Sequence, residues 1–241
     1  MKLLSTFETL DTVTASGSDA NYPVANIKDL DPMIRWHADA YSGDVWIKID
    51  FGAATVLNMI FLNQANFAHA HVQGNATDVW TSPSFDLGVD LARDELNNRK
   101  GWFDLTAFNY RWMRILIPGS QTLDNSETVP ALGNLITGQA VAIPAVSAYT
   151  PDILKRWTRF EPDGGGLIKT TDDRGRHVIT LECADTLSNV RALSKTWEIG
   201  VVFSDLGYPA ESWLVYPPES WSRPTRNILD ATLRWSMEER P

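Results

Sequence analysis

The sequence of 241 residues contains a single cysteine, Cys183, so no disulfide bond can form within the chain. This excludes a small secreted scaffold held together by disulfides and is typical of a protein that folds in a reducing cytosol. No apolar run reaches the roughly 18 residues that a membrane-spanning helix needs, and no signal-peptide hydrophobic region follows the first residues. We therefore expect no membrane insertion.

Basic residues are also scarce, with 21 Lys and Arg against 30 Asp and Glu and a net charge of -9. A nucleic-acid-binding protein usually presents a basic face, because phosphate contacts supply most of its affinity. The acidic balance therefore argues against a nucleic-acid partner and against an anionic membrane surface. The charge is uneven, since residues 1–130 carry 9 basic and 16 acidic side chains and residues 131–241 carry 12 and 14.

Residue sets that support catalysis or metal binding are missing as well. His69 and His71 would lie on one face of a strand, but two ligands do not make a metal site. The run 164–166 of three glycines lacks the Gly-Lys-Ser/Thr of a phosphate loop, and no Gly-x-Ser-x-Gly elbow occurs. Thirty acidic residues always offer pairs for glycoside hydrolysis, which keeps a hydrolase as an alternative. The sequence predicts a protein that is not an enzyme and has no catalytic, cofactor or metal site.

The local pattern is that of β-strands. Residues 45–51, 111–117 and 229–238 alternate apolar and polar side chains, and residues 56–62 are almost continuously apolar. Helical signals are weak, and 90–99 is the stretch that could form about two turns. The side chains opposite the apolar ones in the first two runs are Trp46, Lys48, Asp50, Trp112 and Arg114. We predict an all-β chain.

A polar, turn-rich stretch at 121–130 interrupts the periodic pattern. We therefore predict a first domain at 1–125, a linker at 126–130 and a second, smaller β domain at 131–241.

The ten tryptophans are spread along the chain. Seven aromatic residues stand beside Pro, Gly, Ser or Asp and outside the alternating runs: Trp36, Tyr41, Trp80, Trp102, Trp213, Tyr216 and Trp221. Exposed Trp and Tyr side chains stack on sugar rings or anchor protein interfaces. Alternatively, they close the open ends of a β-sandwich. Taken together, they predict at least one contact surface.

The first part of the chain resembles a known family. It is similar to the discoidin-like (factor 5/8 type C, galactose-binding-like) domain in four segments. These are residues 21–31 followed by Trp36, Val-Trp-Ile-Lys-Ile-Asp-Phe-Gly at 45–52, a strand and loop at 60–67, and Arg-Trp-Met-Arg-Ile-Leu-Ile at 111–117. The resemblance implies a jelly-roll β-sandwich. Extracellular members commonly tie their termini with a disulfide, which this chain lacks, and their ligand-contacting loops do not align here. Sugar or lipid binding is therefore not implied.

The second part is similar to small tail proteins of long-tailed bacteriophages, in which a discoidin-like module is joined to a β domain that assembles at the tail tip. The similarity lies in the order of residues 133–144, a Gly-Gly-Gly loop, residues 175–181, a Trp/Pro-rich stretch and the terminal strand. It implies a non-enzymatic structural component of the virion, a distal tail or minor tail protein made in the host cytoplasm. Such a protein would form a homo-oligomeric ring, would contact other tail proteins and would need no cofactor.

Two sets of aromatic residues follow from these hypotheses. For assembly, the candidate interface residues are Trp213, Tyr216 and Trp221, and strand 229–238 could add to a neighbour's sheet. The alternative function is a carbohydrate-binding module that recognises host-surface glycans. Its candidate contacts are Trp36, Tyr41 and Trp80.

Overall fold

The structure is a computed structural model. It describes residues 2–29, 31, 34–93, 99–142, 146–154, 157–160, 168–171, 176–185, 201–204, 212–215 and 231–238. The chain divides into two compact units. We call Lys2–Ala142 with Val202–Ser212 the N-terminal unit, and Ile143–Val201 with Trp213–Pro241 the C-terminal unit.

The N-terminal unit is built from strands and two short 3-10 helices. Its strands are β1 (Lys2–Phe7), β2 (Thr12–Ala15), β3 (Trp36–His37), β4 (Val45–Ala65), β5 (His69–Asn75), β6 (Phe85–Asp90), β7 (Ala92–Arg93), β8 (Arg99–Ile117), β9 (Ala131–Leu132), β10 (Asn134–Ala142) and β15 (Val201–Ser204). The 3-10 helices are η1 (Val24–Lys28) and η2 (Asp124–Ser126). Among the described residues, no helix is long and apolar enough to cross a membrane.

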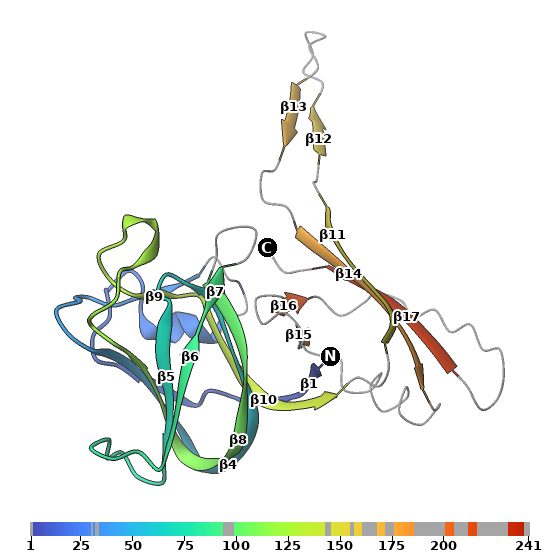
Figure 1. The fold of residues 1–241 in the computed structure, drawn as a ribbon. Coiled ribbons are helices and arrows are strands. Elements are labelled where there is room, and N and C mark those ends of the chain that lie inside the picture. The colour runs from blue at the N-terminus through green and yellow to red at the C-terminus, as the bar shows by residue number, and fades with distance from the viewer. Residues whose placement is uncertain are drawn as a thin grey trace. The chain divides into compact units, whose positions relative to one another are not determined.

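Two long antiparallel strands, β4 and β8, organise the sandwich (Figure 1). Their ladder is interrupted between Asp50 and Thr55, where Gly52 adopts a φ of 75° that favours glycine. The first half of β4 pairs with β2 and the second half pairs with β10, while β8 also pairs with β5, which in turn pairs with β6. Within the N-terminal unit the strands of this sheet follow the order β15-β1-β10-β4-β8-β5-β6, and the sheet is bent over on itself.

The core lies inside this bend. Ile47 and Ile49 of the first half of β4 belong to the same buried cluster as Leu57 and Ile60 of its second half. The alternation in residues 45–51 is therefore confirmed, because its apolar side faces the core and its polar side faces outward.

The second half of β4 is covered on both faces. Ile60 and Leu62 belong to the main core cluster, whereas Met59 and Phe61 are equally buried on the opposite side. A strand of this kind needs apolar residues at consecutive positions, which explains the unbroken apolar run in the sequence.

The C-terminal unit also consists of strands in its described part. They are β11 (Val146–Leu154), β12 (Trp157–Phe160), β13 (Ile168–Thr171), β14 (Arg176–Asp185), β16 (Ser212–Val215) and β17 (Ala231–Glu238). Strands β11, β14 and β17 form a three-stranded antiparallel sheet, and β12 and β13 form a two-stranded one. The predicted fold class, an all-β chain with a β-sandwich and a second β part, is confirmed.

Two details differ from the sequence analysis. The predicted helical turns at 90–99 are wrong where the structure describes them: Asp90 ends β6, residues 92–93 form β7 and Arg99 begins β8. Cross-strand pairing of Ala92 with Lys100 outweighs the weak local helical preference. In addition, the division between units falls after Ala142 rather than near residue 130, because β10 pairs with β1 on one side and β4 on the other.

Candidate binding surface

The outward side of the sheet formed by β2, β4, β8, β5 and β6 carries large aromatic and charged side chains. Lys48 of β4 stands opposite Arg114 of β8, which stands opposite Gln73 of β5. Tryptophans lie on both sides of this row, and the loop between β5 and β6 adds two more residues. We call the resulting set the tryptophan face: Trp46, Lys48, Asp78, Trp80, Trp112 and Arg114.

Lys48 connects two strands of the tryptophan face. Its ammonium nitrogen lies 4.6 Å from the ring centroid of Trp46 and 5.8 Å from that of Trp112. The same nitrogen forms an ion pair with Asp78 at 2.7 Å, and only 16% of the Lys48 side chain is exposed. A cation held over an aromatic ring and partly shielded from water interacts more strongly than one at a fully exposed site. The loop carrying Asp78 is thereby fastened to the sheet.

Arg114 holds Trp80, in the loop between β5 and β6, against the sheet in a similar way. Its guanidinium carbon lies 4.6 Å from the ring centroid of Trp80, and two of its nitrogens donate hydrogen bonds to Oε1 of Gln73 at 2.8 and 2.5 Å. The indole Nε1 of Trp80 donates to Asp78 at 2.5 Å. Trp80 is therefore held by its ring face and by its N–H, in a half-exposed position.

Hydrogen-bonded polar pairs border the tryptophan face on two sides. On one side Arg111 donates two hydrogen bonds of 2.7 Å to Asp50 and lies over the Trp112 ring at 5.5 Å. On the other side His71 contacts Asp86 at 2.8 Å, and Nε2 of Gln73 donates to the second oxygen of Asp86 at 2.9 Å. Within the described ranges, no three His, Cys, Asp or Glu residues are grouped to hold a metal ion.

The pKa of two carboxylates beside the indole rings, Asp78 and Asp50, is lowered. Burial alone would raise the pKa of Asp78, but hydrogen bonds from Lys48 and Trp80 and the nearby positive charges lower it overall. Hydrogen bonds from Arg111 lower the pKa of Asp50, against a smaller opposing effect of burial. Cations and carboxylates therefore neutralise one another around the exposed indole rings.

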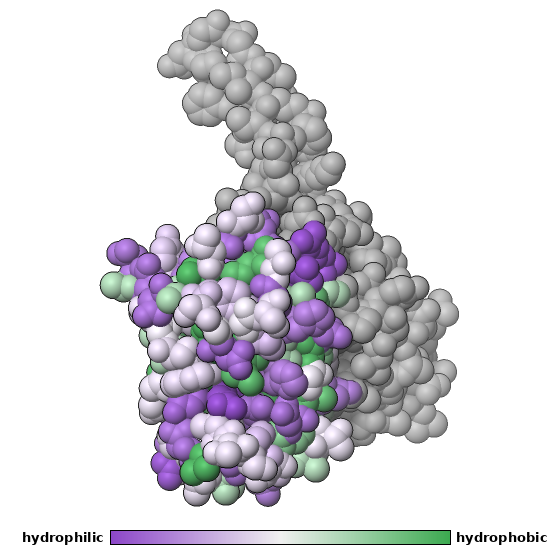
Figure 2. Space-filling model, turned by 60° about the vertical axis from the view of Figure 1, so that its left-hand side comes forward, coloured by the Kyte–Doolittle hydropathy of each residue, from purple (hydrophilic) through white to green (hydrophobic). Residues whose placement is uncertain are grey.

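Such a surface suits a neutral polyhydroxy ligand. Indole rings offer apolar faces for the C–H side of a sugar ring, and the bordering carboxylate and guanidinium groups can accept and donate hydrogen bonds to hydroxyl groups. In the view of Figure 2 the described surface is mostly hydrophilic or intermediate, with apolar residues in small separate groups. A large apolar interface is not visible there.

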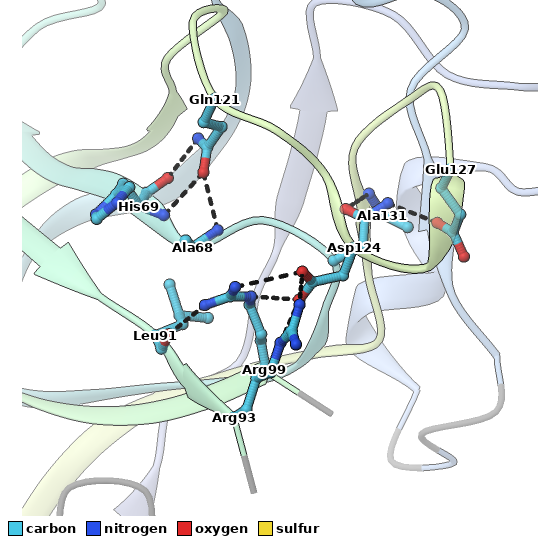
Figure 3. Close-up of polar contacts among 10 residues, drawn as sticks. Ala68, His69, Leu91, Arg93, Arg99, Gln121, Asp124, Glu127 and Ala131 are labelled. Carbon is cyan, nitrogen blue, oxygen red and sulfur yellow. Dashed lines mark hydrogen bonds and ion pairs between the residues drawn. The ribbon is translucent and has the colours of Figure 1, made fainter. Parts of the chain in front are cut away.

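A second polar cluster lies where β4 ends and β8 begins (Figure 3). Asp124, of which 8% is exposed, accepts hydrogen bonds from both Arg93 and Arg99. Arg99 also donates to the carbonyl oxygen of Leu91 at 3.0 Å. Burial alone would raise the pKa of Asp124, but the hydrogen bonds from Arg99 and Arg93 lower it. All the oxygens of this carboxylate are occupied within the protein.

The same cluster fixes the loop 118–131 to the sandwich. Oε1 of Gln121 accepts hydrogen bonds from the backbone nitrogens of Ala68 and His69 at 2.8 and 2.9 Å (Figure 3). Asn66 donates to Glu127 at 2.5 Å, and its Oδ1 accepts from the nitrogen of Ala131 at 2.8 Å. Because these polar groups already bind one another, we interpret the cluster as a structural clamp.

The three aromatic residues predicted to contact glycans have different environments. Trp36 is fully buried in the core, and its Nε1 donates to Ser18 at 2.9 Å, so it presents no ring face to a ligand. Tyr41 packs against the core, and its hydroxyl donates to the carbonyl oxygen of Pro118 at 2.5 Å. Trp80 is the one of the three that reaches the surface described above.

The predicted interface residues belong to the end of the chain. Tyr216 and Trp221 lie outside the described residues. Trp213 is part of β16. Their assignment to an interface stays a prediction.

Sequence reasoning missed the two other tryptophans of the tryptophan face. Trp46 and Trp112 were treated as parts of alternating strands and not as site residues. The signal was nevertheless present, because the same alternation that buries Ile47 and Met113 places Trp46 and Trp112 on the outward side. A tryptophan on the solvent side of a strand is the feature that deserved a functional interpretation.

Comparison with known proteins gives no family assignment. No family model matches the chain, and no curated protein matches it. Solved structures do match.

One is the chitosan-binding module 1 of a chitosanase/glucanase from Paenibacillus sp. IK-5, with 16% sequence identity and a TM-score of 0.42 over 55% of this chain and 97% of the module. Another is the CBM32 of AlyQ in complex with 4,5-unsaturated mannuronic acid, with 19% identity and a TM-score of 0.42 over 55% of this chain and 97% of that one. A third is a Streptococcus pneumoniae fucose-binding module, SpX-3, with 14% identity and a TM-score of 0.43 over 56% of this chain and 98% of that one. Over about half of its length, the chain is similar in fold to these modules. At these identities the likeness transfers no residue's role to this chain.

Proposed function

We propose that the N-terminal unit binds carbohydrate at the tryptophan face. The observation that carries this proposal is the arrangement of three half-exposed indoles, Trp46, Trp80 and Trp112, whose neighbouring charges are already paired. Paired charges leave no net attraction for an ionic ligand but keep donors and acceptors at hand for hydroxyl groups. The function is recognition without catalysis, and host-surface glycans are the proposed ligands.

Replacing Trp80 by alanine is expected to weaken binding of a neutral polysaccharide about 10-fold or more, as removal of a central aromatic contact does at other binding sites. Calorimetric titration of the full chain with soluble bacterial surface polysaccharides measures this. Trp112→Ala should act in the same direction. Tyr22→Ala, which removes a 45% exposed aromatic residue stacked on His37 away from the tryptophan face, serves as the matched control. Undiminished binding by both tryptophan variants, or a polysaccharide panel that gives no binding at all, contradicts the proposal.

A second candidate function is assembly into a bacteriophage tail, as a distal tail or minor tail protein of the virion. One specific observation favours an assembly role. Strands β12 and β13 form a two-stranded ribbon, and within the described part of the chain no third strand pairs with it. An isolated two-stranded hairpin is marginally stable in water. A ribbon of this kind gains stability when it adds to a neighbouring molecule.

The assembly role predicts that the full chain forms an oligomer whose mass rises with protein concentration toward a closed ring. Light scattering coupled to size-exclusion chromatography, from micromolar to high concentration, measures the mass. A chain that remains a monomer over the whole range, alone and at low salt, would count against this candidate and leave carbohydrate binding unaffected.

A further inference from the structure

The indoles of the tryptophan face are spread along the strands. Trp112 of β8 stands opposite Asp50 of β4, and Trp46 precedes Asp50 by four residues on the same strand. Lys48 and Arg114, which also stand opposite each other, form the row between them. Each residue of a strand advances the chain by about 3.4 Å, so roughly 14 Å of strand separates the row of Trp46 from the row of Trp112.

The middle row keeps these two indoles from acting as one contact. The ammonium nitrogen of Lys48 lies over both rings and is held there by Asp78. A single sugar ring that lay on both indoles would have to take the place of the Lys48 side chain. The third indole, Trp80, lies beside the middle row with the guanidinium group of Arg114 over its ring. The face therefore offers separate aromatic contacts in successive rows.

Strand β2 extends this face with hydroxyl groups. Thr14 stands opposite Lys48 and Thr12 stands opposite Asp50, and both threonines are exposed. Val13 between them packs against the core, as the alternation of a strand requires. Threonine hydroxyl groups both donate and accept hydrogen bonds, as the hydroxyl groups of a sugar do. A chain that lies on the indoles of β4 and β8 thus has neutral hydrogen-bonding groups beside it.

The charges around the face favour an uncharged chain. Lys48 is paired with Asp78, and Arg111 is paired with Asp50, so an ionic ligand would have to compete with contacts that the protein already makes. Residues 1–130 carry 16 acidic against 9 basic side chains, and this excess of negative charge repels a polyanion. A neutral chain meets neither obstacle.

We propose that the tryptophan face binds an internal stretch of a linear, neutral polysaccharide, at least about three sugar units long, that lies along β4 and β8. This inference rests on the proposed carbohydrate-binding function and specifies the ligand of the same face. The chain contacts successive rows through the faces of its sugar rings, so no free chain end is needed.

Competition with fragments of defined length measures the bound stretch. The probe is a neutral linear polysaccharide that binds the full chain in the calorimetric panel, and the competitors are its own partial-hydrolysis fragments of one to eight sugar units. We expect the affinity to rise about 10-fold or more from the disaccharide to fragments of four units and then to level off. Fragments whose reducing end has been reduced to the alditol should compete equally well. A polyuronate of similar length should compete about 10-fold less well or worse.

Variants at the two ends of the face test its extent. Trp46→Ala and Trp112→Ala should each lower the affinity for fragments of four or more units about 10-fold, and should lower the affinity for the disaccharide less. Trp46→Phe keeps an aromatic ring and should retain most of the gain with length. Tyr22→Ala should leave the whole length series unchanged, and hydrogen exchange of the β4 and β8 amides checks that each variant is folded.

The outcomes separate this inference from the proposed function. Fragments of one or two units that compete as well as longer ones, end variants that lower the affinity for every length by the same factor, or equal competition by a polyuronate would overturn it while carbohydrate binding stands. A panel in which no polysaccharide binds overturns both.

Discussion

Replacing Trp36 by alanine is expected to lower the free energy of unfolding of the N-terminal unit by about 3–5 kcal/mol. Trp36 is fully buried and is among the largest completely enclosed side chains of the described core. Its loss removes the apolar contacts of the indole, leaves a cavity beneath η1, whose Ile27 belongs to the same cluster, and deprives Ser18 of its hydrogen-bond donor. Most of the expected loss of stability comes from packing, and the lost hydrogen bond adds to it.

Hydrogen exchange of the β4 and β8 amides, followed by mass spectrometry of the full chain, reports the stability of this unit separately from the C-terminal one. Trp80→Ala is the matched control, because it removes a tryptophan from the surface and should change exchange in β4 and β8 only slightly. Equal effects of the two variants would contradict the assignment of Trp36 to the core and of Trp80 to the surface.

Replacing Asp124 by alanine is expected to destabilise the N-terminal unit by about 2–3 kcal/mol. The carboxylate is buried and accepts hydrogen bonds from Arg93 and Arg99, so its removal leaves two guanidinium groups without their partner. Loss of one member of a fully buried ion pair costs more, but 51% of the Arg93 side chain is exposed, and water compensates part of the loss. Exchange should rise most in the segment around Leu91 and in loop 118–131.

The pH dependence of stability tests whether the negative charge of Asp124 is the cause of this stabilisation. Because the pKa of Asp124 is lower in the folded protein than in an unfolded chain, its contribution is complete above the ordinary aspartate pKa of about 4 and is lost as the pH falls through the folded value. The difference in stability between wild type and Asp124→Ala should therefore shrink below about pH 4. Asp11→Ala, at an exposed aspartate, should show little effect at any pH. A difference that stays constant down to pH 2 contradicts this interpretation.

How much of this molecule the sequence predicts depends on the range of the interactions involved. Alternation within one strand is a local property, and it correctly places Ile47 in the core and Trp46 on the outward side. The position of Trp36 depends instead on how β3 is enclosed, since Trp36 pairs with Leu132, almost a hundred residues away. The neighbouring polar residues Arg35, His37 and Asp39 do not reveal such burial, so a glycan contact was predicted where the chain has a core residue.

The clamp around Asp124 was beyond sequence reasoning for the same reason. Its arginines lie 31 and 25 residues before Asp124 along the chain, with strand β8 in between and no regular spacing to detect. The tryptophan face is likewise an effect of register, because only the pairing of β4 with β8 and of β8 with β5 brings Lys48, Arg114 and Gln73 into one row. The local sequence indicates whether a residue lies in a strand, but it does not indicate which residues lie beside it on neighbouring strands.

The bend of β4 and β8 has a mechanical consequence. Since both layers of the sandwich are made from the same two continuous strands, one layer cannot slide over the other without distorting the backbone at the Gly52 fold and breaking the ladder on either side of it. The two layers are consequently joined at one end by the Gly52 fold and at the other end by the Asp124 clamp. Sliding of one layer over the other would therefore strain the Gly52 fold and the Asp124 clamp together.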